Sequence, residues 1–283
     1  SDVRTQYLTF LQGLPAAFDE QRKQAVTDTA GWLKRHDDNS DVRTQYLTFL
    51  QGLPPAFDEQ RKQAVTDTAD WLKRHDDDST ETVRTRYLTF LQGLSAAFDE
   101  QRTDAAKATC DWLERLIARN PANFGHNFIY AEQLRRLSRF EEAIVQYDFV
   151  LNRHKGHQIA RRGRAIALQK LGRVSEAEAE FKHALWWAGC NEQSQAIFHT
   201  SLGEFYLETK RWPEAINSFQ QAQKEFPDYF GNHWGIAKAQ IGLGNFDKAE
   251  EAVQRALEDP NLKPPARDEI VQFLADIRLR RSS

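Results

Sequence analysis

The sequence of 283 residues contains no methionine, only two cysteines and no apolar run that approaches the ~18 residues a membrane-spanning helix needs. Cys110 and Cys190 are too few for a disulfide framework and form no Cys-x-x-Cys pair, so we expect a reducing, cytoplasmic setting. The N-terminus also lacks the basic and apolar segments of a secretory signal. The absence of methionine, the initiator included, favours a fragment of a longer protein.

Motifs typical of catalytic and metal sites are missing as well. The sequence has no glycine-rich phosphate loop, no Gly-x-Ser-x-Gly and no His-Glu-x-x-His. His154 and His157 have the spacing of a metal-binding pair, but the positive charge of Arg153 and Lys155 opposes a divalent cation at that place. We interpret them as solvated turn histidines, and we expect no catalytic residues, no metal and no cofactor.

Charge of one sign is not in excess over the whole chain. The 38 Lys and Arg against 41 Asp and Glu give a formal net charge of −3, which offers no global reason to expect nucleic acid or an anionic membrane as a partner. Positive charge is concentrated locally, because residues 135–173 contain ten basic and three acidic side chains, a net +7. This basic stretch leaves anionic-ligand or nucleic-acid binding open as an alternative to a set of solvated helix faces.

The N-terminal part of the chain consists of repeats. Residues 1–39 recur as 40–78 with only three changes, and a diverged third copy occupies 79–121. Each copy predicts two helices, because apolar residues recur at helical spacing on both sides of a Gly-Leu-Pro or Gly-Leu-Ser break. Acids between the copies, such as Asp76 and Asp77, are expected to cap the next helix. Pairs of such short helices must stack on one another to bury both apolar stripes.

Two surfaces of these copies allow more than one interpretation. Polar residues opposite the apolar stripe recur at equivalent positions, and stacking would align them in rows that either contact an extended partner or merely reflect the duplication. These residues are Thr5, Thr9, Gln12, Thr44, Thr48, Gln51, Thr85, Thr89 and Gln92. The first copy has no polar outer face of its own, so we expect the array to continue before Ser1, with self-association through this copy as the alternative.

A second pattern begins near residue 123. Marker alanines spaced 34, 38 and 34 residues apart are each followed four residues later by a large side chain: Ala143 by Tyr147, Ala177 by Phe181, Ala215 by Phe219 and Ala249 by Val253. Leu202-Gly203-x2-Tyr206 provides the preceding half of one unit, and Ala131, Ala165 and Ala237 take the place of Gly203 in the others. Residues 122–263 therefore resemble four tetratricopeptide repeats, followed by a capping helix over 264–283.

The resemblance implies an all-α fold, a right-handed α-solenoid of stacked antiparallel helix pairs. It also implies a non-catalytic scaffold that binds a protein or peptide, acidic ones included, along a concave groove lined by the first helix of each pair. The candidate partner-binding residues are Glu132, Arg135, Arg136, Arg162, Gln169, Lys170, Thr200, Glu204, Glu208, Trp234 and Lys238. The 39-residue copies resemble helical-hairpin repeats attached to bacterial STAND-type NTPases, which implies a sensor arm; a structural self-assembly element is the alternative.

Two further local predictions concern the second pattern. Arg161, Arg162 and Arg164 cannot all point the same way on one helix, so at least one must leave the groove. Trp186 and Trp187 lie in the inserted turn, where an exposed indole would be an anchor for a partner, although partial burial of both is the favoured interpretation.

Overall fold

The structure is a computed structural model that describes residues 3–13, 15–36, 39–189, 191–260, 262 and 264–282. In these ranges the chain forms fifteen α-helices and four short 3-10 helices, with no strand, which confirms the predicted all-α fold of stacked helix pairs. Backbone contacts divide the chain into two compact units, Ser1–Ser138 and Arg139–Ser283. No helix of the described ranges is both long and apolar enough to cross a bilayer.

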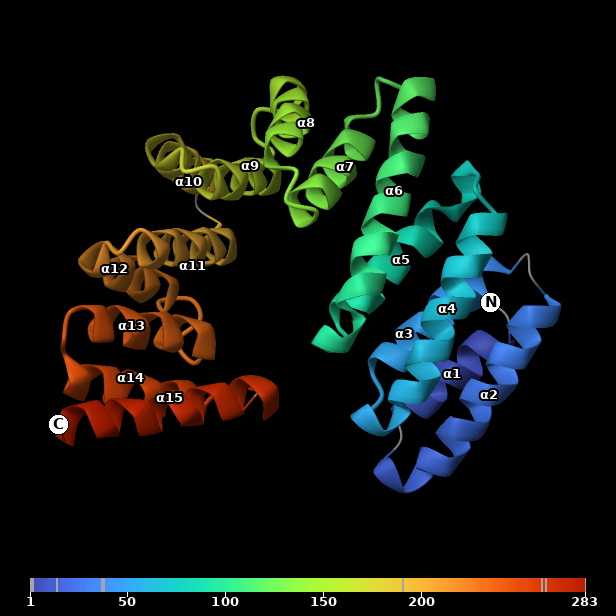
Figure 1. Cartoon of the computed structure of the whole chain (residues 1–283), viewed down its shortest axis with the longest axis horizontal. Helices are drawn as coiled ribbons and strands as arrows, with labels where there is room; N and C mark the ends of the chain where they lie inside the picture. The colour runs from blue at the N-terminus through green and yellow to red at the C-terminus, as the bar shows by residue number, and fades with distance from the viewer. Residues whose placement is uncertain are drawn as a thin grey trace. The chain divides into compact units, whose positions relative to one another are not determined.

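The first unit contains three helical hairpins and one additional helix (Figure 1). The hairpins are formed by α1 (Val3–Gln12) with α2 (Asp19–Arg35), α3 (Ser40–Gln51) with α4 (Asp58–Arg74), and α5 (Glu81–Gln92) with α6 (Asp99–Arg119). Helix α7 (Phe124–Arg136) follows and packs on α6. Each 39-residue copy is thus a pair of helices, as its apolar periodicity predicts.

An arginine joins the two helices of each hairpin, and in the first two hairpins it is buried. Arg22 donates from Nε to the carbonyl oxygen of Leu11 at 3.2 Å, and Arg61 donates in the same way to Leu50 at 3.1 Å. Arg102 repeats the contact in the third hairpin. The carbonyl groups at the end of a helix have no partner within the helix, so a guanidinium placed there satisfies them while also pairing with an aspartate one turn earlier in its own helix.

Successive hairpins contact each other through their first helices. The side chain of Gln12 lies over Gly52 so closely that a Cβ at Gly52 would come within 2.7 Å of its Nε2, and Gln51 lies over Gly93 in the same way at 2.8 Å. Gln45 also donates to Thr9 Oγ1 at 3.0 Å. Members of the predicted polar rows thus reach into the joints between hairpins, Gln12 and Gln51 toward a glycine of the next hairpin and Thr9 toward Gln45.

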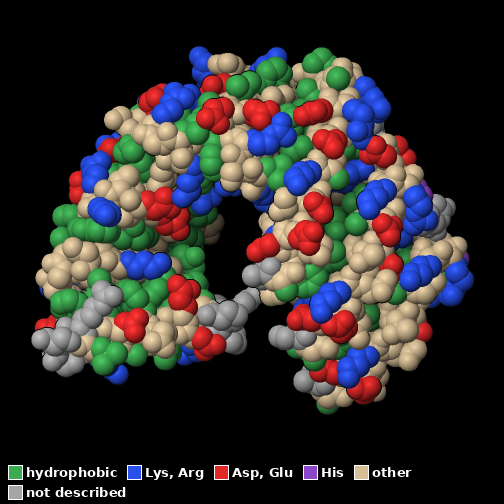
Figure 2. Space-filling view, viewed as in Figure 1, with side chains coloured by type: hydrophobic (Ala, Val, Ile, Leu, Met, Phe, Trp, Pro, Cys, Tyr) green, Lys and Arg blue, Asp and Glu red, His purple; other side chains and the backbone are tan. Residues whose placement is uncertain are grey.

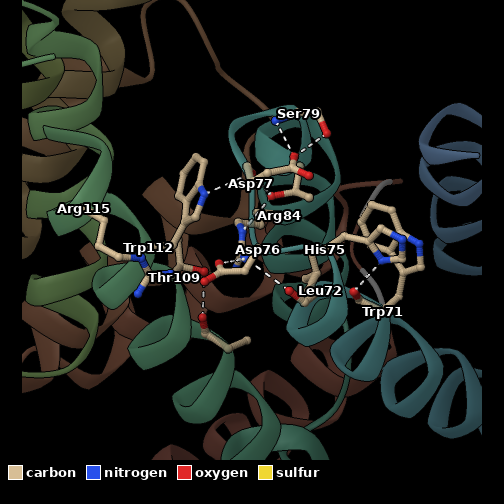
Figure 3. Close-up of polar contacts among 12 residues, drawn as sticks. Trp71, Leu72, His75, Asp76, Asp77, Ser79, Arg84, Thr109, Trp112 and Arg115 are labelled. Carbon is tan, nitrogen blue, oxygen red and sulfur yellow. Dashed lines mark hydrogen bonds and ion pairs between the residues drawn. The ribbon is translucent and has the colours of Figure 1, made fainter. Parts of the chain in front are cut away.

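The junction between the second and third hairpins is stabilised by a polar cluster (Figure 3). Asp76 pairs with Arg84 at 2.7 Å and also with Arg115, and the guanidinium of Arg84 lies 5.2 Å from the ring centroid of Trp112. Asp77 accepts a hydrogen bond from the backbone N–H of Ser79 at 2.8 Å, which confirms a capping role for this acid. Hydrogen bonds from Ser79 also lower the pKa of Asp77.

The second unit stacks seven further helix segments and ends in a long helix. Helices α8 (Phe140–Arg153), α9 (Gln158–Lys170), α10 (Val174–Ala188) and α11 (Glu192–Glu208) are followed by α12 (Trp212–Ala222), α13 (Phe230–Gly242), α14 (Phe246–Leu257) and α15 (Pro264–Ser282). All four marker alanines are fully buried. Ile270 and Ile277 of α15 are buried in a cluster with the apolar side chains of α14, so α15 covers the last pair.

Candidate protein-binding face

The first helices of consecutive pairs in the second unit, α9, α11 and α13, are connected by hydrogen bonds between their side chains. Arg162 Nε donates to Ser201 Oγ at 2.6 Å, and Gln169 Nε2 donates to Glu208 Oε2 at 2.9 Å. Thr200 Oγ1 donates to Asn232 Oδ1 at 2.9 Å. These contacts bring eight predicted site residues onto one surface, the first-helix face, defined by Arg162, Gln169, Lys170, Thr200, Glu204, Glu208, Trp234 and Lys238.

Glycines facing aromatic rings allow these helices to come together. A Cβ at Gly203 of α11 would lie 2.8 Å from the ring of Phe219, and one at Gly235 of α13 would lie 2.4 Å from the same ring. In the preceding pair a Cβ at Gly163 would lie 2.4 Å from Tyr147 Oη. Each ring occupies the space that a side chain at the facing glycine would need. The helices therefore approach closely, and their outward-facing side chains come within hydrogen-bonding distance of each other.

Charges of both signs are interspersed on the first-helix face. Lys170 pairs with Glu208 at 3.0 Å, and Lys238 Nζ lies 4.7 Å from the ring centroid of Trp234. Partial burial raises the pKa of Glu204, with Arg162 opposing the shift and Glu208 adding to it. The three cations and two carboxylates leave a single net positive charge on the face.

The remaining predicted site residues lie on α7 in the first unit. Arg135 pairs with Glu132 at 2.8 Å. Arg136 is exposed and lines a cavity of about 350 Å³ together with residues of α5 and α6, among them Gln92 and Arg102. These three residues therefore belong to the other unit and take no part in the hydrogen bonds that connect α9, α11 and α13.

The basic stretch is largely neutralised by nearby acids. Six of its ten basic side chains form ion pairs, namely Arg135, Arg139, Arg161, Arg164, Lys170 and Arg173. Arg161 and Arg164 both reach Glu180 of α10, whereas Arg162 points toward α11, so the predicted divergence of these arginines is confirmed. On the side seen in Figure 2, basic and acidic side chains are interspersed.

Two other candidate features differ in their outcome. The rings of His154 and His157 lie 5.7 Å apart, and burial together with the neighbouring His154 lowers the pKa of His157. In the described residues, no group of three or more His, Cys, Asp or Glu comes together as a metal would require. Trp186 is 72% exposed, so the partial burial expected of both indoles is wrong for this one, whereas Trp187 is 42% exposed and packs beside Gly156. Cys190 lies outside the described residues.

Sequence periodicity did not identify two polar residues that hold the first-helix face together. Ser201 and Asn232 are buried, on positions of α11 and α13 that face the neighbouring first helix. The sequence signal that could have found them is a polar side chain, a serine or an asparagine, at a position of the helix that is otherwise occupied by apolar residues. Because a buried polar group needs a partner, each implied a cross-helix hydrogen bond, although its partner could not be named from the sequence.

The fold and this face define a helical-repeat protein whose pairs stack through small residues. Models of the tetratricopeptide repeat family match residues 131–190, 164–230 and 206–267. Together these matches span residues 131–267, just under half of the chain. A search of curated proteins found no match.

Solved structures of other repeat proteins have the same fold. A tetratricopeptide repeat protein from Parabacteroides merdae is 13% identical, with 98% of this chain and 100% of that one covered and a TM-score of 0.65. PilW, a type IV pilus biogenesis factor, is 18% identical over 82% and 98%, with a TM-score of 0.55. A thermophilic tetratricopeptide repeat protein of Thermus thermophilus is 20% identical over 65% and 94%, with a TM-score of 0.51. At these identities the likeness concerns the fold alone.

Proposed function

We propose that the first-helix face binds an extended segment of another protein and that the chain acts as a non-catalytic scaffold. The observation that carries this proposal is the cross-helix network: Arg162 with Ser201, Thr200 with Asn232 and Gln169 with Glu208. A surface whose side chains are already fixed by such contacts loses little conformational freedom when a partner binds.

The chemistry of the face favours a segment with acidic and aromatic side chains. Trp234 is half-buried, packs edge-on against Phe273 at 4.5 Å and is flanked by Lys238, so it can anchor an apolar side chain beside a positive charge. Arg162 also acts electrostatically on Glu204 and provides a second positive charge for a carboxylate of the partner. Each exposed ion pair contributes only ~0.2–1 kcal/mol, so affinity requires several contacts along the row.

The pairing within the basic stretch supports a protein partner over a nucleic acid. A polyanion binds by displacing counterions from many free cations. Most of the basic side chains here already face a carboxylate. Recognition of a trigger by the sensor arm of a STAND-type protein is one role for such a scaffold, and it rests on the resemblance of the 39-residue copies alone.

The experiment selects peptides from a random library displayed on phage and compares two charge reversals in the full chain. Lys238→Glu lies on the first-helix face, whereas Lys248→Glu makes the same change at an exposed position of α14. We expect selected peptides to bind Lys238→Glu roughly tenfold more weakly, because attraction becomes repulsion, and to bind Lys248→Glu as they bind the parent. Equal binding to both variants would refute the proposal.

A further inference from the structure

The first hairpin of the chain exposes apolar side chains whose equivalents in the next two hairpins are buried. Val3, Tyr7, Phe10 and Phe18 are 79%, 48%, 63% and 39% exposed. The same four residue types in the second and third hairpins are between 0% and 4% exposed; they are Val42, Tyr46, Phe49, Phe57, Val83, Tyr87, Phe90 and Phe98. The difference in exposure therefore comes from a neighbouring hairpin and not from the type of side chain.

The neighbour that buries these positions is the preceding hairpin. Helix α3 packs against α1 and α2, and α5 packs against α3 and α4. In both interfaces a glutamine of the preceding hairpin lies over a glycine of the next, Gln12 over Gly52 and Gln51 over Gly93. At Gly13, the equivalent position of the first hairpin, a Cβ would meet only the carbonyl oxygen of Phe10 in its own helix. We name Val3, Tyr7, Phe10, Gly13 and Phe18 the leading face, and the surface a hairpin turns toward the next one its trailing surface.

We propose that the leading face docks the trailing surface of a further 39-residue hairpin joined ahead of α1 in the same polypeptide. The same interface forms twice within the chain, between the first and second hairpins and between the second and third, with the same residue types. The surface complementary to the leading face is therefore known: it is the trailing surface of a hairpin. A hairpin this short needs a stacked neighbour in order to fold, which favours a covalently joined occupant over a free one. Residues 75–80, which connect α4 to α5, show how such a hairpin is linked to the next.

A second copy of the chain does not offer the complementary surface. In the described residues the trailing surface of the first hairpin is covered by α3, that of the second by α5 and that of the third by α7. A second copy meeting this chain leading face to leading face would not reproduce the contact between a leading face and a trailing surface. A covalently joined hairpin is therefore the occupant that repeats the interface already present, and self-association stays the alternative.

The test adds a second copy of residues 1–39 directly before Ser1 of the full chain and measures amide hydrogen exchange in α1. We expect these amides to exchange at least about a hundredfold more slowly, because burial of two large apolar side chains shifts the opening equilibrium by that much. Binding of a hydrophobic dye to the chain should fall at the same time. Unchanged exchange in α1 would overturn the proposal.

A substitution distinguishes docking from a general stabilising effect. Phe10→Asp should hardly alter exchange in the parent chain, where Phe10 is largely exposed, but should abolish the added protection in the extended chain, where the position is buried like Phe49. An equal effect in both chains would contradict the proposal. Dimers of the parent chain that grow with concentration and disappear in Phe10→Asp would show that a second copy is the occupant instead. These outcomes do not depend on the first-helix face, so failure of this proposal is distinguishable from failure of the proposed function.

Discussion

Glu178 is the acid whose removal should most clearly weaken the second unit. It accepts hydrogen bonds from Tyr206 at 3.0 Å, Lys182 at 2.8 Å and Arg211 at 2.6 Å, and so connects α10 to α11 and to the start of α12. Burial alone would raise its pKa, but these three donors hold the pKa at about 2, against an ordinary 4.5. At 1.36 kcal/mol for each tenfold change, the ionised form contributes about 3 kcal/mol to stability.

We therefore expect Glu178→Gln to lower the free energy of unfolding at pH 7 by about 2–3 kcal/mol, since the amide keeps part of the hydrogen bonding. The assay is urea unfolding of parent and variant at several pH values. Because the folded-state pKa is depressed, the contribution is complete above pH 4.5 and is lost as the pH falls toward about 2, where parent and variant should converge. Glu176→Gln, at an exposed pair with Arg173, should unfold as the parent does. A difference between parent and Glu178→Gln that stays constant from pH 7 to pH 3 would refute the electrostatic argument.

Four backbone positions give further predictions. Lys210 has φ 58° in the turn after α11, a conformation that glycine adopts more easily, so Lys210→Gly should raise stability by about 1 kcal/mol. Gly172 has φ 75° in the equivalent turn after α9, so Gly172→Ala should lower stability by a similar amount. Thermal unfolding of both variants checks the sign of each change. Gly235→Ala should cost about 1–3 kcal/mol in urea unfolding because its methyl group would meet the ring of Phe219, whereas Gly31→Ala in α2, with only a flexible arginine at 3.8 Å, should be stabilising by about 0.5–1 kcal/mol. Stabilisation by both alanines would contradict the packing that holds the first helices together.

The helix pairs could be predicted because their signals are local. Marker alanines such as Ala143 and Ala215 are fully buried where the spacing placed them, and Phe219 fills the gap beside Gly203 that the pattern anticipates. The first-helix positions of α9, α11 and α13 followed from the same register, which is why eight predicted site residues share one face.

Features that depend on a distant partner could not be predicted. Arg22 and Arg61 have the sequence signature of exposed helix residues, yet they are buried because each finds free carbonyl groups at the end of the preceding helix. Trp186 is more exposed than expected because the inserted turn extends α10, where its ring contacts only the edge-on and itself exposed ring of Trp187 among the ring contacts of the described residues. The division of the chain near residue 138 has no compositional signal either. The STAND resemblance and the ranges of the individual repeats stay predictions.

The contact of Gln12 with Gly52, repeated by Gln51 with Gly93, gives both joints between hairpins the same glutamine-over-glycine contact. Insertion or deletion of one whole copy by recombination between the near-identical segments therefore reproduces a joint that the chain already contains. Gene variants that differ in the number of copies can all encode folded chains of different length, while the first-helix face stays unchanged.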